Sequence, residues 1–238
     1  MFRKFQWIGS SLLMAVILIT TASVGNIRSV AQKRNGTKIV ATFLPMYMFT
    51  KGVTGDTGEV EILIPAGADP HEYQSTPENA RTIAQADVLV KNGLGLEEFL
   101  EKLVDATGNS RLQEIDASQN IQPIEEEDEH HHGHDHDHDH EEGNPHVWLD
   151  PVLAQQQVKN IRDGLIKADS NNATTYKTNA DIYLQKLQQL DQEFQTRLAP
   201  FKGCKFIVFH DAYPYLAKRY NLQQTAVVEL PQDNITPR

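Results

Sequence analysis

The sequence has one cysteine, Cys204, in 238 residues. A single thiol excludes an internal disulfide, so we expect Cys204 to be a buried bystander. The sequence contains no His-Glu-x-x-His motif, which excludes one well-marked class of zinc peptidase. The apolar run at residues 8–19 is too short to cross a bilayer, which requires about 20 residues.

The N-terminus has the three parts of a secretory signal peptide. Arg3 and Lys4 precede the apolar run, and small and polar residues follow it at positions 20–25. We therefore expect residues 1–25 to be a signal peptide that directs export to the periplasm, with an uncleaved membrane anchor as the alternative. Because no cysteine follows the apolar run, a bacterial lipid anchor is not expected.

The charge imbalance comes from one segment. The net charge is −10, and residues 125–142 contain ten acidic residues but no lysine or arginine. The rest of the chain is balanced and offers no basic face, so we expect no nucleic-acid partner. An acidic segment of this kind attracts cations.

The same segment is rich in histidine. Its imidazoles alternate in part with aspartates and lie at His130, His131, His132, His134, His136, His138 and His140. Imidazole suits zinc, copper and nickel, so the composition predicts an auxiliary, low-affinity metal-binding loop. A solvated acidic linker with incidental histidines is the alternative.

Strand and helix patterns alternate in the first part of the chain. We predict strands at residues 38–43, 60–64, 87–91 and 112–116, and helices at 46–53, 79–85 and 96–104, with Thr76 as an N-cap and Pro77 in the first turn. This alternation is typical of βαβ units with a parallel sheet. Residues 38–150 are therefore predicted to form an N-terminal α/β lobe that carries the histidine-rich loop.

The pattern changes to helices over residues 151–200. One helix is predicted at 152–167, and a longer linking helix has an apolar stripe made of Tyr176, Ala180, Tyr183, Leu187, Leu190, Phe194 and Leu198. A coiled-coil dimer is the competing interpretation, but the stripe is shorter than four heptads. We therefore expect an intramolecular helix and a monomer.

Residues 201–238 resemble part of a second α/β lobe. A buried strand is predicted at 205–209, a helix at 210–220 and another strand at 225–230. Two strands make a small sheet with an exposed edge and an unfilled core. We therefore expect this second lobe to be incomplete and the chain to be truncated.

Three histidines lie outside the run, at the places where such lobes bind ligands. His71 and His210 follow predicted strands in different lobes, and His146 precedes the helix at their junction. Ligands bind outside the carboxyl ends of parallel strands, so these side chains are predicted to share a cleft. Three neutral imidazoles suit zinc, and a zinc hydrolase stays open as a minor alternative because catalytic zinc can also have three histidine ligands.

Several motifs resemble those of one protein family. They are Gly67-Ala68-Asp69-Pro70-His71-Glu72-Tyr73, Asn92-Gly93-Leu94-Gly95-Leu96-Glu97, Asn144-Pro145-His146-Val147-Trp148-Leu149-Asp150-Pro151, and Phe209-His210-Asp211-Ala212-Tyr213 with Tyr215-Leu216. With these motifs, residues 38–231 resemble the substrate-binding proteins of ABC transporters for zinc and manganese, specifically the zinc-uptake branch.

The resemblance implies a fold and a set of ligands. It implies two Rossmann-like α/β lobes joined by one long rigid helix, with metal bound between them by His71, His146 and His210. Manganese members typically have a carboxylate at the position of His210, so histidine favours zinc. The family's fourth ligand comes from a later segment than this sequence contains, so water, Glu72 or a histidine of the run would take that place.

Together these features predict an exported zinc carrier rather than an enzyme. It would capture Zn²⁺ and deliver it to the membrane permease of a zinc ABC transporter. A zinc buffer or storage protein that acts through its histidine-rich loop is one alternative, and a manganese-type member of the same family is another. Because imidazole binds metal only when neutral, zinc should be lost below a pH of roughly 6.

Overall fold

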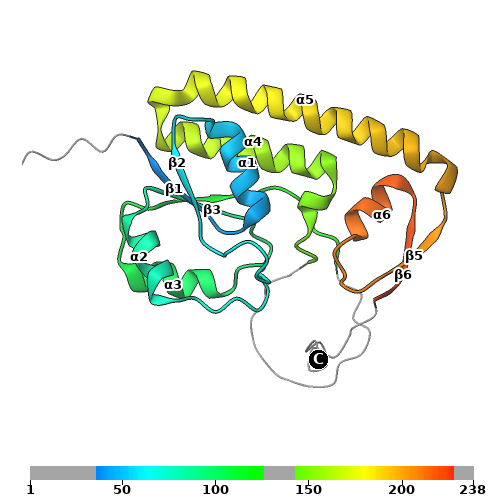
Figure 1. Cartoon of the computed structure of the whole chain (residues 1–238), viewed down its shortest axis with the longest axis horizontal. Coiled ribbons are helices and arrows are strands. Elements are labelled where there is room, and N and C mark those ends of the chain that lie inside the picture. Colours follow the sequence, from blue (N-terminus) through cyan, green and yellow to red (C-terminus); the bar gives the residue numbers. More distant parts are fainter. Residues whose placement is uncertain (1–35, 126–142, 228–238) are drawn as a thin grey trace, which may run out of the picture. The chain divides into compact units, whose positions relative to one another are not determined.

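The computed structural model describes residues 36–125 and 143–227, which all belong to one unit, Asn35–Arg238 (Figure 1). In chain order the elements are β1 (Lys38–Ala41), α1 (Leu44–Thr54), β2 (Glu59–Ile62), α2 (Pro77–Gln85), β3 (Val88–Lys91), α3 (Phe99–Thr107), β4 (Gln113–Asp116), η1 (Val147–Leu149), α4 (Pro151–Ala168), η2 (Ser170–Asn172), α5 (Ala173–Leu198), η3 (Ala199–Phe201), β5 (Lys205–Val208), α6 (Pro214–Tyr220) and β6 (Gln223–Val227). The predicted signal peptide and histidine run lie outside the described residues.

The first sheet is parallel, as the alternating pattern predicts. Its four strands lie in the order β2-β1-β3-β4, so β1 pairs with both β2 and β3. The chain therefore crosses over between strands through helices, and all four carboxyl ends meet at one edge. This is the edge at which an open α/β sheet binds its ligands.

Helices cover both faces of this sheet (Figure 1). Ile39 and Val90 point into the larger core, which α1, α4 and α5 complete, whereas Val40 and Leu89 point into a smaller core with α2 and α3. Neighbouring residues of one strand thus enter different cores, because side chains alternate across a pleated strand. Burial on both faces explains why these strands are apolar at nearly every position.

The long helix α5 packs within its own chain, as predicted. Tyr176, Ala180 and Leu187 of its apolar stripe are buried in the larger core, and the ring of Tyr183 packs edge-on against Phe49 of α1 at 5.8 Å. The stripe is covered less well toward the end of α5, where Leu190 is 40 % exposed. The helix leads from the first sheet to the second, which gives the α/β fold with a long connecting helix that the sequence predicts.

The second sheet pairs β5 with β6 in parallel. The predicted burial of its first strand is wrong, because Ile207 is 67 % exposed and Phe209 is 71 % exposed. Within the described residues β5 has one partner strand, and no helix layer covers these two side chains. Cys204, directly before β5, is also exposed rather than buried.

Two predicted helices begin later than expected. Residues 210–213 are not helical, and α6 begins at Pro214, whose fixed φ and missing N–H suit the first helical turn. Helix α3 begins at Phe99, three residues after the predicted position, and the turn before it contains Gly93, Leu94 and Gly95, which all have positive φ. The predicted cap of α2 is confirmed: Thr76 and Asn79 form a capping box.

Candidate metal centre

Three imidazoles converge at the ends of the two sheets. The Nε2 atom of His146 lies 3.2 Å from Nε2 of His71 and 2.8 Å from Nε2 of His210. Their ligand atoms all lie within 4.8 Å of one another, the arrangement expected of a metal site. For comparison, a tetrahedral Zn²⁺ with Zn–N bonds of about 2.0–2.1 Å separates its ligand nitrogens by about 3.3 Å.

Each histidine comes from a different part of the fold. His71 lies in the loop between β2 and α2, where its backbone N–H donates to Oδ1 of Asp69 at 2.9 Å. His210 lies two residues beyond the end of β5, and His146 directly precedes η1 and α4. The structure thus brings together residues up to 139 positions apart, with His71 and His210 exposed and His146 buried.

Asn144 fixes the orientation and the tautomer of His146. Its Oδ1 accepts the backbone N–H of His146 at 3.1 Å and lies 3.0 Å from Nδ1 of the same residue. Its Nδ2 donates to the backbone carbonyl of Asp211 at 2.7 Å, so Oδ1 must act as the acceptor. Nδ1 of His146 therefore carries the proton, and Nε2 presents its lone pair to the other two imidazoles.

A buried polar network supports the segment before His146. The Nδ2 atom of Asn92 donates to the carbonyl of Pro145 at 3.0 Å, and its Oδ1 accepts from Gln157 at 2.9 Å. The carboxylate of Glu97 accepts the backbone N–H groups of Asn92 at 2.8 Å and Gly93 at 3.2 Å. Burial raises the pKa of Glu97, although these hydrogen bonds act in the opposite direction.

The protonated form of His146 is strongly disfavoured. Burial, and then the positive charges of protonated His210 and His71, lower its pKa from 6.5 to about 3, against the opposite effect of Asp69. Trp148 contributes to this burial, since its ring centroid lies 5.0 Å from that of His146. His146 is therefore neutral, and able to bind a metal, over a wide range of acidic pH.

Tyr215 holds together Ile124 and Asn144, which flank the histidine-rich segment and form a closed neck beside the centre. Its hydroxyl donates to the carbonyl of Asn144 and accepts the backbone N–H of Ile124 at 2.9 Å. Asn144 also donates its own backbone N–H to the carbonyl of Ile124 at 2.9 Å. The two ends of the histidine-rich segment are thus held together beside His146.

The remaining predicted site residues do not join this group. The carboxylate of Glu72 lies outside the group of ligand atoms formed by the three histidines, so its proposed role as a fourth ligand stays a prediction. The auxiliary histidines, His130 to His140, lie outside the described residues. Asn144 and Tyr215 belong to the sequence motifs, but the sequence analysis did not predict their roles. Their positions could have indicated them, because Asn144 lies two residues before His146 and Tyr215 lies five residues after His210.

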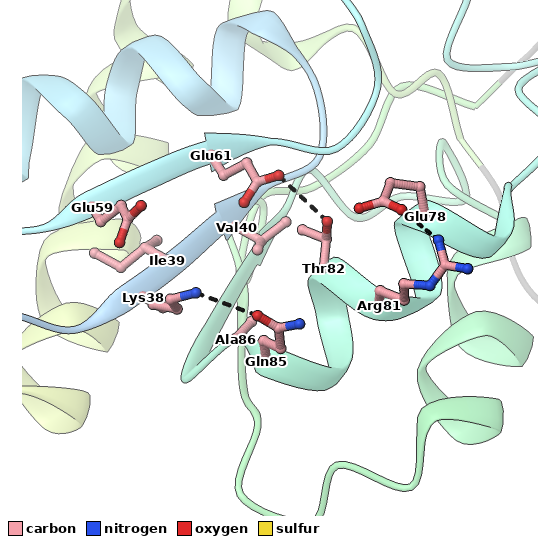
Figure 2. Close-up of a pocket in the computed structure, with 10 residues that line it drawn as sticks. All are labelled: Lys38, Ile39, Val40, Glu59, Glu61, Glu78, Arg81, Thr82, Gln85 and Ala86. Carbon is pink, nitrogen blue, oxygen red and sulfur yellow. Dashed lines mark hydrogen bonds and ion pairs between the residues drawn. The ribbon is translucent and has the colours of Figure 1, made fainter. Parts of the chain in front are cut away.

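Two cavities lie on the first lobe. One, of about 170 Å³, lies between α2 and strands β1 and β2, and its side chains pair with one another, as Lys38 does with Gln85 and Glu61 with Thr82 (Figure 2). None of the three histidines lines it. The other, of about 530 Å³, lies beside His71 and includes Glu72, so it adjoins the centre already described.

A protein-family model supports the metal interpretation. Residues 39–238 match the family described as "Zinc-uptake complex component A periplasmic", ZnuA. The chain belongs to the ZnuA family. Proteins of this family are solute-binding components of transport systems. Within the part of the chain that the structure describes, no helix is long and apolar enough to cross a membrane.

Individual relatives agree with this assignment. The chain is 38 % identical to the "High-affinity zinc uptake system protein ZnuA" of Bacillus subtilis, over 98 % of this chain and 74 % of that protein. It is 30 % identical to the "Manganese-binding lipoprotein MntA" of Halalkalibacterium halodurans, over 93 % and 70 %. The crystal structure of Zn(II)-bound AdcA from Streptococcus pneumoniae matches with a TM-score of 0.71 and 36 % identity, over 82 % of this chain and 40 % of that one. The predicted fold and family are thus confirmed, and the chain spans less than half of AdcA.

Proposed function

We propose that the chain is the metal-capturing component of a zinc-uptake system. It binds one Zn²⁺ ion through the Nε2 atoms of His71, His146 and His210 and delivers it to a membrane permease of the ABC type, without chemical turnover. We further infer that residues 1–25 direct export and that the chain acts as a monomer. The domain limits predicted from the sequence remain part of this proposal.

The convergence of three Nε2 atoms is the observation that carries the proposal. Two of the three separations, 2.8 and 3.2 Å, are already close to those of a tetrahedral zinc site, so little rearrangement is needed for binding. Two of the ligands are exposed, which gives the ion a path from solvent, and a water molecule or a further side chain can complete the coordination.

The ligand set favours zinc over manganese. All three donors are imidazole nitrogens, and no carboxylate of the described residues belongs to the group. Imidazole suits zinc, whereas manganese prefers carboxylate and water oxygens. The names of the B. subtilis and S. pneumoniae relatives also refer to zinc.

A competitive titration tests the proposal. We expect the chain without residues 1–25, and with residues 125–142 replaced by two glycines, to bind one equivalent of Zn²⁺ tightly against a chromophoric chelator. The neck formed by Ile124 and Asn144 allows this short replacement. The matched control has the same deletion and the triple substitution His71→Ala, His146→Ala and His210→Ala, and it should bind no tight equivalent.

The same titration examines the storage alternative. A buffer that acts through its histidine-rich loop would bind several weaker equivalents in the undeleted chain and none tightly after the deletion. That result, with no difference between the deletion variant and its triple-alanine control, would contradict the carrier proposal. If the deletion variant bound Mn²⁺ alone only weakly, that result would exclude the manganese alternative.

Asn144→Ala is expected to weaken Zn²⁺ binding by about 10- to 100-fold, the usual effect of removing a hydrogen-bond partner of a metal-binding histidine. The substitution frees Nδ1 of His146 to change tautomer. The control is Asn109→Ala, which likewise removes hydrogen bonds from an asparagine Nδ2 to backbone carbonyls, those of Ile83 and Ala86, but far along the chain from the ligands. Equal affinities of these two variants would show that Asn144 does not orient His146.

A further inference from the structure

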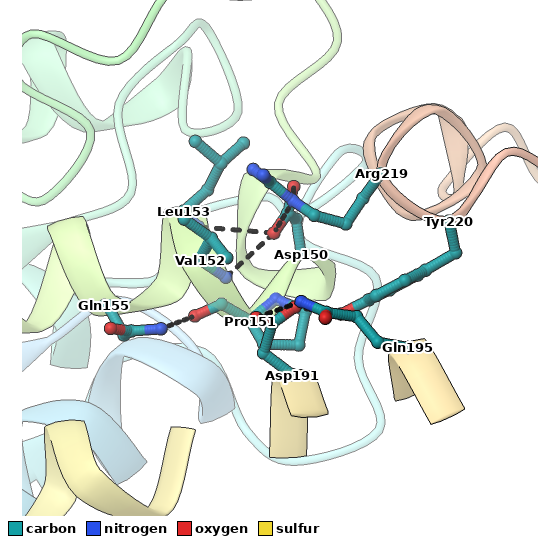
Figure 3. Close-up of polar contacts among 9 residues, drawn as sticks. All are labelled: Asp150, Pro151, Val152, Leu153, Gln155, Asp191, Gln195, Arg219 and Tyr220. Carbon is teal, nitrogen blue, oxygen red and sulfur yellow. Dashed lines mark hydrogen bonds and ion pairs between the residues drawn. The ribbon is translucent and has the colours of Figure 1, made fainter. Parts of the chain in front are cut away.

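An ion pair joins the two segments that carry ligands. Asp150, four residues after His146, is 2 % exposed, and its two carboxylate oxygens accept from Nε of Arg219 at 2.9 and 2.7 Å (Figure 3). Arg219 lies on α6, the first helix after His210. The contact thus connects the beginning of α4 to the helix that follows the other ligand.

The same carboxylate begins α4. Oδ1 of Asp150 accepts the backbone N–H groups of Val152 at 2.8 Å and Leu153 at 3.4 Å, the usual pattern of an N-cap. This places the anion at the positive end of a helix of 18 residues. The Asp150 carboxylate is therefore held in place by α4, and its ion pair with Arg219 holds α6 against the beginning of α4.

A second contact fixes the orientation of α6. The hydroxyl of Tyr220 donates to Oδ1 of Asp191 on α5 at 3.0 Å, and Gln195 donates to the other oxygen of that carboxylate at 2.8 Å (Figure 3). The ring of Tyr220 also packs edge-on against Phe194 at 5.4 Å. Helix α6 is thus attached to the beginning of α4 by Arg219 and to α5 by Tyr220.

We propose that Asp150 and Arg219 form a latch that holds the His210 segment against the His146 segment and sets the rate at which bound metal leaves. This inference rests on the proposed function. The three Nε2 atoms lie close together in the same arrangement in which the ion pair is formed, so the pair holds the two ligand segments in the geometry that suits the ion. Release requires His210 to move away, and α6 can follow only after Arg219 leaves a buried carboxylate, which is costly.

Stopped-flow release kinetics test the latch. The chain is loaded with less than one equivalent of Zn²⁺ and mixed with excess chromophoric chelator, and association is measured separately from Trp148 fluorescence. Asp150→Asn keeps an N-cap side chain but removes the charge, and Arg219→Gln removes the partner. We expect each variant to release zinc about 10-fold faster or more, from the usual strength of charged hydrogen bonds, with a smaller change in association.

Controls separate the latch from a general loss of stability. Lys218→Gln removes an exposed positive charge from the same helix and should release zinc like the wild-type chain. The Asp150→Asn, Arg219→Gln double variant should release zinc no faster than either single variant, since the same interaction is lost in all three.

Unchanged release in both single variants, or additive effects in the double variant, would overturn the latch while zinc binding itself stands. A wild-type chain that binds no zinc would overturn the proposed function, and the latch with it.

Discussion

Replacing His146 by alanine is expected to weaken Zn²⁺ binding by more than about 100-fold, because loss of an outer partner alone costs about 10- to 100-fold. The effect should exceed that of His71→Ala or His210→Ala. His146 is 5 % exposed, and its Nε2 lies 3.2 Å from Nε2 of His71 and 2.8 Å from Nε2 of His210. The exposed positions can take up a water ligand after substitution, whereas a cavity at the buried one cannot replace a fixed imidazole.

The three single variants are compared by competition against the same chelator, and Trp148 gives an independent signal. The sequence has two tryptophans, Trp7 and Trp148, so Trp148 is the sole tryptophan of a chain without residues 1–25. Its ring lies 5.0 Å from that of His146, and metal binding there should change its fluorescence. If His71→Ala or His210→Ala caused the larger loss, His146 would not be the central ligand.

The metal-free chain is expected to lose stability as the pH falls below 6.5, in part because of His146. This residue stays neutral in the folded chain, where its pKa is about 3, but it binds a proton in the unfolded chain near the ordinary value of 6.5. The unfolded state therefore binds more protons in this window, and the free energy of unfolding rises with pH. One such histidine contributes roughly 1.5 kcal/mol between pH 5 and pH 6.5, and nothing further well above 6.5.

Urea unfolding of the wild-type chain and of His146→Gln, both with chelator present, isolates this contribution. Glutamine does not titrate, and it is a neutral polar residue of similar length. The difference in unfolding free energy between the two chains should therefore change with pH in the stated direction. Parallel pH profiles would contradict the low pKa of His146.

Local signals predicted much of the first lobe. Thr76 with Pro77 marked the beginning of α2, and short apolar runs between turns marked four strands. Parallel strands bring their carboxyl ends to one edge, so the position of His71 beyond a predicted strand made it one of three candidate ligands. The predicted helix at 210–220 was wrong at its beginning because Pro214, and not His210, suits the first turn.

Long-range contacts were not predictable from the sequence. Arg219 lies 69 residues from Asp150, and no periodicity or spacing connects an arginine on a short helix to an aspartate that already serves as a cap. The burial of the first strand in the second sheet was also mispredicted, since Ile207 and Phe209 have an apolar composition but, within the described residues, no covering layer. Exposure depends on neighbours that a strand's own residues do not specify.

The closed neck at Ile124 and Asn144 allows the segment between them to be replaced without changing the rest of the fold. Its ends meet through a backbone hydrogen bond and share the hydroxyl of Tyr215, so the fold depends on where they meet and little on how many residues separate them. Doubling the length of such a loop costs only about 0.6 kcal/mol in closure entropy. Descendants of one ancestor can therefore lengthen, shorten or recompose this stretch without rebuilding the centre.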